Sequence, residues 1–236
     1  MERLQKVIAN SGYTSRRNAE KLILEGKVTV NGNIINTLGT KVNNSDIITV
    51  DGNALNQAVV KEYYLLNKPR GVISSSLDEK GRKTVVDLID TDARIYPIGR
   101  LDYDTTGIIL LTNDGELANL LMHPKNRIIK TYLAKLEGII DINTLKKIKN
   151  GVVVDNRKVE VVDVKLKQKD VIKNTSFVSI SIIEGRNHIV KKLFKEVGFC
   201  VEKLSRTGYD FLTLDNLKSG EYRKLSIKEV KRLYNK

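Results

Sequence analysis

The stretch 99–115, GRLDYDTTGIILLTNDG, constrains the fold most, because an uninterrupted apolar run directly follows an acidic loop. The run GIILLT shows no alternation of apolar and polar residues, which predicts a strand buried on both faces. The segments KTYLAKLEG and FVSISIIEG also predict strands, and too few helical segments separate the strands for a regular strand–helix–strand repeat. We therefore expect an α+β (mixed α/β) fold with a largely antiparallel or mixed main sheet.

Three segments of the second part predict helices. Asp114 is a candidate N-cap for DGELANLLMHP, and Pro124 lies beyond the end of that helix. HIVKKLFKEVG has apolar residues on one helical face and is expected to end at Gly198, and SIKEVKRLYNK predicts a final amphipathic helix.

The start of the chain predicts a small separate module, and we expect domains at residues 1–57 and 62–236. RLQKVIANSG and TSRRNAEKLILEG predict two helices, the second capped by Thr14 or Ser15. Asn31-Gly32 in KVTVNGNII suits a type I′ turn, so this segment predicts a β-hairpin, and DIITVDGN predicts one more strand. The polar segment near residues 56–62 is the candidate linker.

The formal net charge of +13 over 236 residues favours a polyanionic partner, chiefly nucleic acid. A general basic bias of the source proteome would give the same figure. No apolar run approaches the roughly 20 residues needed to cross a bilayer, and charges interrupt the start MERLQKVIANSG. We expect a cytoplasmic protein with no membrane partner. Cys200, the single cysteine, is expected to be a small buried filler, and the two histidines do not predict a zinc site.

Six cations of the first module are expected on the exposed side of its two helices and the turn after them: Arg3, Lys6, Arg16, Arg17, Lys21 and Lys27. Ordinary solvated helix faces would show the same pattern. Arg16 and Arg17, however, fall in the first turn of the second helix, where cations oppose the helix dipole and a bound phosphate would offset that cost. RLQKVIANSGYTSRRNAEKLILEGKVTVNG resembles the small RNA-binding domain of a small-subunit ribosomal protein and some tRNA synthetases. The resemblance implies that the basic helix face binds structured RNA.

Asp102 is the candidate for chemistry, because it lies between Leu101 and Tyr103 and a carboxylate in a partly apolar setting is costly unless it is paired or used. No nearby His or Cys would complete a hydrolytic triad. Asp104, before Thr-Thr-Gly, is typical of a cap or turn residue. The residues alone are compatible with a single-carboxylate enzyme and indicate nothing more specific.

NKPRGVISS, GRLDYDTTGIILLTNDGELANLLMHP, KTYLAKLEG and IIEGRNHIVKKLFKEVG occur in the order and spacing of the pseudouridine synthases of the RsuA/RluB family. The resemblance extends over almost the whole chain. It implies isomerisation of a uridine in RNA: the bond from ribose to N1 is cut, the uracil turns, and C5 is joined to C1′. Such a reaction needs no cofactor and no metal, and the target nucleotide must be flipped out of the stack.

The resemblance assigns roles to particular residues. Asp102 matches the catalytic aspartate, for which attack on C1′ and removal of a ribose proton are alternative routes. Tyr132 matches a tyrosine that packs on the uracil and can take part in proton transfer. Val190 matches an apolar position that lines the uracil pocket, and Lys191 matches the Arg or Lys that pairs with the aspartate and keeps it ionised. Arg100 matches a residue that holds flipped or displaced nucleotides, although an ion pair with Asp102 or Asp104 is an equal alternative.

The chain departs from the family pattern in reading NHIVK where many relatives read NHQVR-like segments. Lysine keeps the charge at Lys191 but not the bidentate fork of arginine. His188 is expected to be a structural hydrogen-bonding residue, and Lys68, with Pro69 and Gly71, is expected to shape the turn beneath the site.

The central motif resembles members acting on large-subunit ribosomal RNA more than members acting on the small subunit, in which aspartate often replaces Asn113. We expect a monomer acting on ribosomal RNA of the large subunit or on a pre-ribosomal particle. Small-subunit RNA is the first alternative. A non-catalytic RNA-binding assembly factor is the second, and the intact set of Asp102, Tyr132 and Lys191 argues against it. A nuclease is disfavoured because the sequence shows no metal-binding carboxylate cluster.

Overall fold

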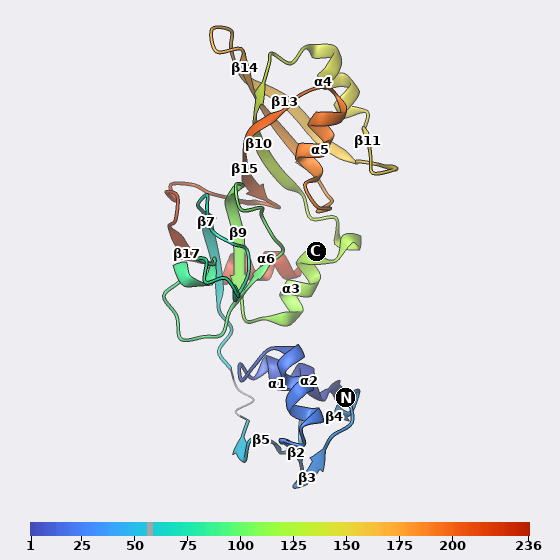
Figure 1. Ribbon diagram of the computed structural model, residues 1–236, viewed down its shortest axis with the longest axis vertical. Coiled ribbons are helices and arrows are strands. Elements are labelled where there is room, and N and C mark those ends of the chain that lie inside the picture. Colours follow the sequence, from blue (N-terminus) through green and yellow to red (C-terminus); the bar gives the residue numbers. More distant parts are fainter. Residues whose placement is uncertain (56–58) are drawn as a thin grey trace. The chain divides into compact units, whose positions relative to one another are not determined.

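The computed structural model describes residues 1–55 and 59–236. The chain forms two compact units (Figure 1). The first comprises Met1–Glu62, Thr91–Ile95 and Asn113–Gly115, and the second comprises Tyr63–Asp90, Tyr96–Thr112 and Glu116–Lys236. The linker expected near residues 56–62 lies partly outside the described residues, so the boundaries 1–57 and 62–236 stay predictions.

The first unit packs two helices on short strands. α1 (Leu4–Asn10) and α2 (Arg16–Leu24) contribute Leu4, Ile8 and Ile23 to a core closed by strand residues. Ser15, rather than Thr14, is the N-cap of α2, because its side chain accepts a hydrogen bond of 3.1 Å from the Asn18 amide.

The strands of the first unit include the expected hairpin of β2 (Val28–Val30) and β3 (Asn33–Ile35). Asn31 and Gly32 have φ of +51° and +82°, as a type I′ turn requires. β5 (Ile48–Val50) pairs with β2 as the further predicted strand, and β6 (Asn53–Ala54) extends that sheet. The pairing of β1 (Glu2–Arg3) with β4 (Lys41–Val42) had no signal in the sequence.

The main sheet of the second unit is mixed, which confirms the predicted class. Its strand order is β13 (Val161–Asp170), β14 (Thr175–Ile182), β10 (Lys130–Glu137), β15 (Val201–Tyr209), β9 (Thr106–Thr112), β7 (Tyr63–Lys68) and β17 (Tyr222–Lys224). Two short strands, β8 (Tyr96–Ile98) and β16 (Leu212–Thr213), pair with β9 and β15. β15 and β9 run parallel, and the other pairs of this sheet are antiparallel.

The predicted strand GIILLT is buried as expected, since every residue of β9 after Thr106 is buried. Two helices cover the end of the sheet that contains β9 and β7, namely α3 (Gly115–Met122) and α6 (Ile227–Tyr234). They pack Leu117, Leu121 and Leu233 on residues of these two strands (Figure 1). A capping box between Ser226 and Glu229 begins α6.

The opposite end of the sheet has α5 (Ile189–Glu196), which buries Leu193 and Phe194 as predicted, and α4 (Ile142–Lys149), which packs on β13. The short hairpin β11 (Val153–Val154) and β12 (Arg157–Lys158) lies next to α5. Two 3₁₀ turns, η1 (Val86–Leu88) and η2 (Pro124–Asn126), complete the unit. Of these elements α4, β13 and the central strand β15 were not anticipated from the sequence.

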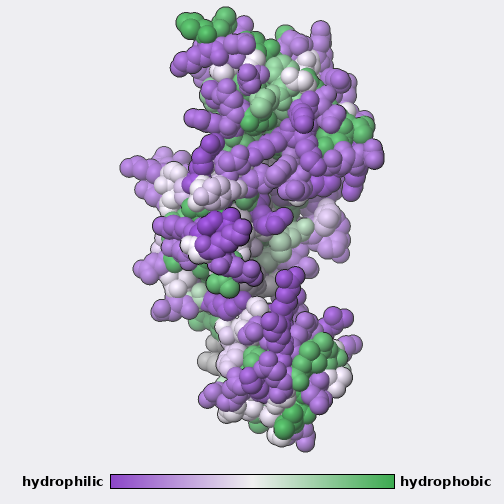
Figure 2. Space-filling view, in the orientation of Figure 1, coloured by the Kyte–Doolittle hydropathy of each residue, from purple (hydrophilic) through white to green (hydrophobic). Residues whose placement is uncertain are grey.

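Hydrophilic residues cover most of the face seen in Figure 2, and a hydrophobic group stands out at the tip of hairpin β13–β14. Val171 and Ile172 at that tip are 71% and 98% exposed. Cys200 is also exposed, so its expected burial was wrong. The physical reason is its position in the turn from α5 to β15, where the amide of Glu137 donates to its backbone carbonyl at 3.0 Å and its side chain lies at the surface. No helix in the described part of the chain is long and apolar enough to cross a membrane.

Candidate active site

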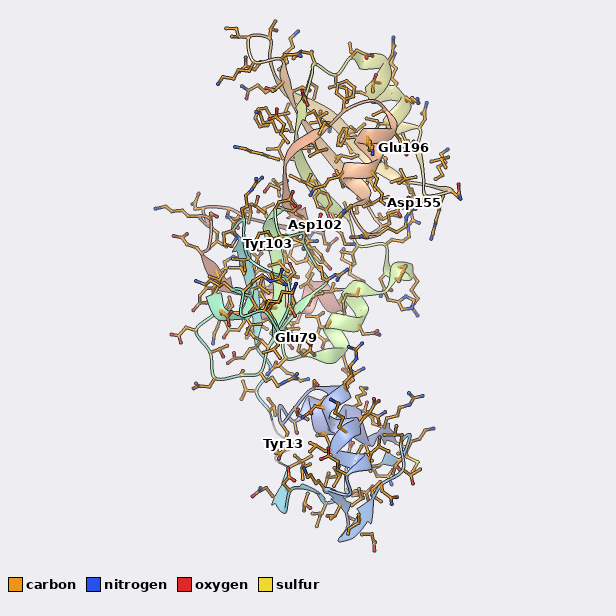
Figure 3. The ribbon with its side chains drawn as sticks, viewed as in Figure 1. Tyr13, Glu79, Asp102, Tyr103, Asp155 and Glu196 are labelled. Carbon is orange, nitrogen blue, oxygen red and sulfur yellow. The ribbon has the colours of Figure 1, made fainter. Side chains whose placement is uncertain are left out.

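Asp102 lies in the loop between β8 and β9 of the second unit (Figure 3). Buried Ser74 fixes the residue before it: the Ser74 hydroxyl donates to the Leu101 carbonyl at 2.7 Å and accepts from the Leu101 amide at 3.0 Å. The Thr105 amide closes the turn on the Asp102 carbonyl at 3.1 Å. The loop therefore holds a carboxylate that is 28% exposed on a rigid backbone.

Lys68 supports this loop from below, in agreement with its expected role. Its side chain is fully buried, and its Nζ donates to the carbonyls of Thr105 at 2.9 Å and Pro69 at 3.0 Å. Burial lowers the pKa of Lys68 to about 8, against the opposing attraction of Asp104 and Asp102. The lysine thus ties the turn after β7 to the loop containing the carboxylate.

Two cationic or proton-bearing groups from the start of α5 approach Asp102. His188, the N-cap residue with φ of +54°, places Nε2 3.2 Å from Oδ1, and Lys191 places Nζ 3.5 Å from Oδ2. Lys191 also bonds both carboxylate oxygens of Asp104, at 2.7 and 2.8 Å, and this hydrogen bonding lowers the pKa of Asp104. The predicted Lys191–Asp102 pair is present, but Asp104, expected as a cap or turn residue, is the closer partner.

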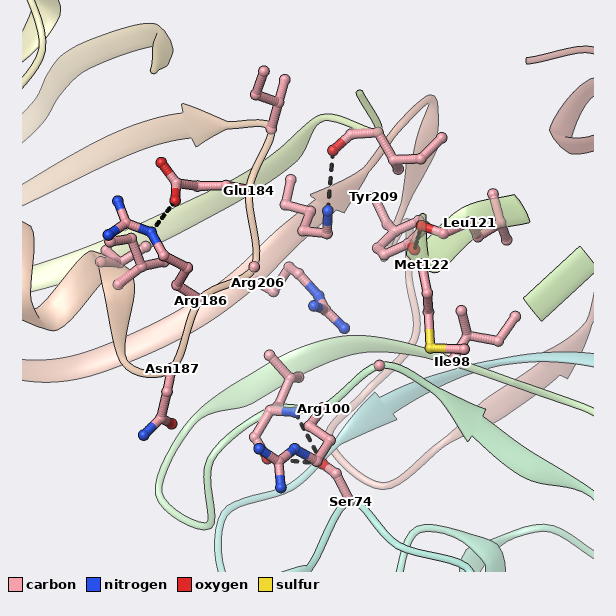
Figure 4. A pocket seen from close by; sticks show the side chains of 18 of the residues that line it. Ser74, Ile98, Arg100, Leu121, Met122, Glu184, Arg186, Asn187, Arg206 and Tyr209 are labelled. Atoms are coloured by element: carbon pink, nitrogen blue, oxygen red, sulfur yellow. Dashed lines mark hydrogen bonds and ion pairs between the residues drawn. The ribbon is translucent and has the colours of Figure 1, made fainter. Parts of the chain in front are cut away.

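A cavity of about 970 Å³ lies over this loop, within the second unit (Figure 4). Asp102, Tyr132 on β10, Val190 on α5 and Arg100 all line it. Tyr132 and Val190 are 7% and 3% exposed. Arg100 is exposed, and no ion pair of the described residues joins it to either carboxylate, so the ion-pair alternative for Arg100 is not realised. The structure thus gathers residues from three separate parts of the sequence: the segment with Arg100 and Asp102, the strand with Tyr132, and the helix with Val190.

The cavity also contains residues that the sequence analysis missed, chiefly Arg206 and Tyr209 on β15 and Lys130 on β10. Arg206 is only 3% exposed. In any strand, side chains two residues apart point to the same face, so a strand over VEKLSRTGY places Arg206 on the face of Leu204 and predicts a buried cation.

Two of the six cations of the first unit form ion pairs within that unit. Lys6 pairs with Glu2, and Lys27 pairs with Glu25 at 2.7 Å. Within residues 1–55 and 59–236, no acidic partner is found for the other four, Arg3, Arg16, Arg17 and Lys21, all of which are exposed. Arg3 belongs to β1 and not to a helix, which corrects its expected placement: pairing with β4 extends the chain before α1 begins. Arg16 and Arg17 open α2, as expected.

Comparison with known proteins agrees with this geometry. The model of the family RNA pseudouridylate synthase matches residues 62–196, and that of the S4 domain matches residues 2–48. The chain is 51% identical to the ribosomal large subunit pseudouridine synthase B of Bacillus subtilis (strain 168) over 234 residues, which cover 99% of this chain and 96% of the relative. It is 40% identical over 235 residues to an uncharacterized RNA pseudouridine synthase of Aquifex aeolicus (strain VF5), covering 98% and 93%.

A solved structure described as a crystal structure of pseudouridylate synthase superposes with a TM-score of 0.68 at 31% identity, over 99% of this chain and all of the other. Together with the matches of both family models, this shows the fold and the family of the chain. The chain belongs to the RNA pseudouridylate synthase family and is an RNA pseudouridine synthase with an S4 domain before its catalytic part.

Proposed function

We propose that this enzyme converts a uridine of large-subunit ribosomal RNA to pseudouridine, with Asp102 as the catalytic carboxylate. The observation that supports it best is the setting of Asp102: a rigid loop presents it to a cavity, with His188 and Lys191 beside its two oxygens. A carboxylate held in this way keeps its direction without being fully shielded from a substrate.

The proposed reaction begins with the uridine flipped out of its helix into the cavity, because C1′ and N1 cannot be reached in a stacked duplex. The N1–C1′ bond breaks with its electron pair moving to the uracil. Two routes are then possible. On one, Asp102 attacks the electron-poor C1′, and on the other, a ribose proton is removed to give a glycal. After the ring turns, C5 bonds to C1′ while the Asp102–C1′ bond breaks or, on the glycal route, while the ribose regains its proton. C5 then loses its proton and N1 gains one, so the product is an isomer of the substrate.

Tyr132 and Val190 are proposed to hold the uracil between them. Both are almost fully buried and line the cavity that Asp102 faces. Stacking of a base on an aromatic ring contributes roughly 1–3 kcal/mol, which helps to offset the cost of removing the nucleotide from its helix. Arg100, exposed at the same cavity, is proposed to hold the displaced nucleotides.

The choice of large-subunit RNA is supported by the name of the Bacillus relative. Asn113, the position at which the resemblance implies a difference between large-subunit and small-subunit enzymes, does not line the cavity. Its amide accepts from the Glu62 amide and donates to the Val60 carbonyl, both at 2.8 Å. A carboxylate could not make the second bond, so Asn113 acts on backbone structure rather than on the base. We propose that the enzyme acts as a monomer in the cytoplasm, on free ribosomal RNA or a pre-ribosomal particle.

The first test replaces the carboxylate. Asp102→Asn keeps the shape of the side chain but removes its charge, so we expect loss of pseudouridine formation with nearly unchanged RNA affinity. Tritium release from ribosomal RNA labelled at uridine C5 measures the reaction. Asp155→Asn is the matched control. Asp155 pairs at 2.6 Å with Lys192, which follows Lys191 in α5, but Asp155 does not line the cavity.

Substantial tritium release by Asp102→Asn would contradict the role of Asp102. Mapping of pseudouridines in both ribosomal subunits, with and without the enzyme, tests the substrate separately. A missing modification confined to the small subunit would overturn the choice of large-subunit RNA while leaving the role of Asp102 intact.

A further inference from the structure

Two cations of the cavity that are not exposed, Arg206 and Lys130, have no carboxylate partner in the described part of the chain. The three acidic residues that line the cavity are Asp102, Glu160 and Glu184. Each of these carboxylates is already paired: Asp102 with His188 and Lys191, Glu160 with Arg127, and Glu184 with Arg186. Within the described part of the chain, no ion pair reaches Arg206 or Lys130.

Arg206 is held firmly but is incompletely satisfied. Its Nε donates to the Ile108 carbonyl on β9 at 2.7 Å, and its guanidinium lies 5.2 Å from the centroid of the Tyr209 ring. Its Nη2 is buried and has no hydrogen-bond partner among the described residues. In Figure 4 this guanidinium extends into the pocket between Tyr209 and the loop bearing Arg100. A buried donor without a partner is costly, so the position is prepared for an acceptor.

Lys130 adds a second positive charge on the same side of the cavity. Its Nζ lies 5.8 Å from the centroid of the same Tyr209 ring and donates to the Ile128 carbonyl at 3.1 Å. Burial and the charge of Arg206 lower the pKa of Lys130 to about 8. Two partly repelling cations in one desolvated place favour a ligand atom with negative charge.

The deep burial of Arg206 favours the base of the flipped uridine, and not a phosphate, as the ligand of its guanidinium. In the sheet Arg206 is the direct partner of Tyr132, and side chains that face one another across antiparallel strands lie on the same side. Tyr132 is proposed above to stack on the uracil. A guanidinium only 3% exposed lies beyond the reach of a phosphate at the mouth of a cavity, whereas a flipped base enters deepest.

We propose that Arg206, together with Lys130, binds a carbonyl oxygen of the uracil and stabilises the negative charge that the ring acquires when the N1–C1′ bond breaks. The electron pair of that bond moves to N1 and is delocalised onto the carbonyl oxygens. It is returned when C5 bonds to C1′ and the C5 proton leaves. Fixed cations at the place where charge develops stabilise a transition state more than a ground state. This inference rests on the proposed entry of the flipped uridine into this cavity.

The first measurement compares Arg206→Gln with Arg206→Lys. We expect the neutral variant to lower the single-turnover rate of tritium release about 100-fold, with RNA affinity within twofold, because the interaction strengthens only as charge develops. Lysine restores charge and should recover part of the rate. Total RNA from cells that lack the enzyme, labelled at uridine C5, serves as substrate, so the assay does not depend on which ribosomal RNA contains the target.

The second measurement uses ribosomal RNA transcribed with 5-fluorouridine. C5 of this base carries fluorine in place of a proton, so the rearranged ring keeps the fluorine and takes up water at C6, and this product is followed by liquid chromatography after digestion. Fluorine withdraws electrons and itself stabilises the ring anion. We therefore expect the loss caused by Arg206→Gln to be about tenfold smaller on 5-fluorouridine than on uridine. Lys130→Met should show the same dependence with a smaller loss, and it gives an independent reading if Arg206→Gln does not fold.

Three results would overturn the proposal. They are an unchanged rate for both variants, an equal loss on uridine and 5-fluorouridine, and weaker RNA binding with a reduced salt dependence, which would indicate a phosphate contact. The wild-type enzyme on the same RNA separates the two proposals. A wild type that modifies only small-subunit RNA overturns the proposed substrate, and an active wild type with an equally active Arg206→Gln overturns the role of Arg206.

Discussion

Lys191 shows how one cation can serve two carboxylates with different consequences. It bonds Asp104 through both oxygens at 2.7 and 2.8 Å and remains 3.5 Å from Asp102. Because Asp104 takes the strong hydrogen bonds, Asp102 keeps an oxygen that the lysine approaches without fully engaging. Asp104 therefore positions the lysine, and the lysine sets the charge environment of Asp102.

Asp104→Asn tests this arrangement at the level of single residues. Without the second carboxylate, Lys191 is expected to move onto Asp102 and hold it in a tight ion pair, which makes the Asp102 carboxylate less reactive on either route. We expect the single-turnover rate to fall about tenfold, with RNA affinity unchanged. Tritium release measures the rate, and Asp155→Asn again serves as the control, because Asp155 pairs with Lys192, the next residue of α5. A rate equal to that of the wild type would show that Asp104 does not position Lys191.

At the level of elements, the parallel pair β9–β15 is what brings the carboxylate loop and Arg206 into one site. Gly107 pairs with Arg206 in this register, with φ of +104°. A Cβ added there would lie 2.2 Å from the Arg206 carbonyl oxygen and 2.7 Å from its nitrogen. Only glycine allows the two backbones to approach so closely, because the contact is with rigid backbone atoms.

Gly107→Ala is therefore expected to lower the free energy of unfolding by about 3 kcal/mol or more, through steric overlap and an unfavourable φ. Urea denaturation followed by circular dichroism measures the change. Gly185→Ala is the matched control, because no atom lies within 4 Å of its added Cβ and its φ is ordinary, so a change below about 0.5 kcal/mol is expected. Equal stabilities of the two variants would show that the close approach of β9 and β15 has no energetic importance.

At the level of the whole molecule, we propose that the first unit contributes affinity for RNA and the second unit carries out the reaction. The first presents exposed arginines at the start of α2, where the helix dipole adds to their attraction for phosphate. The second contains the cavity and both carboxylates. Affinity for RNA and chemistry on one base can then be changed separately, because phosphate contacts position the RNA while the cavity selects the base.

The double variant Arg16→Ala, Arg17→Ala is expected to weaken RNA binding and to reduce the slope of log affinity against log salt by about 2, because two phosphate contacts release their counterions. Fluorescence anisotropy at several salt concentrations measures both quantities. Arg16→Lys with Arg17→Lys keeps the charge and should keep the slope. An unchanged slope in the alanine variant would rule out these arginines as phosphate contacts.

Much of the fold followed from local patterns in the sequence. Four features depend on a few neighbouring residues each, and each was found where it was expected. They are the cap at Ser15, the turn at Asn31-Gly32, the buried strand β9 and the amphipathic face of α5. The elements that were missed lack such local signals. β13 is long and largely exposed, and β15 contains a buried arginine, so neither has the apolar alternation that predicts a strand.

By itself, the sequence determined the class of the fold, the two-part organisation proposed for the chain, and the residues that resemble those of a pseudouridine synthase. Only the tertiary structure decided how those residues meet: that Lys191 bonds Asp104 more closely than Asp102, and that Arg206 and Lys130 enter the same cavity. The reason is physical. Local patterns depend on a few neighbouring residues. The site, in contrast, is built from the β8–β9 loop, β10, α5 and β15, and the distances between their side chains are set by the pairing of strands that are remote in the sequence.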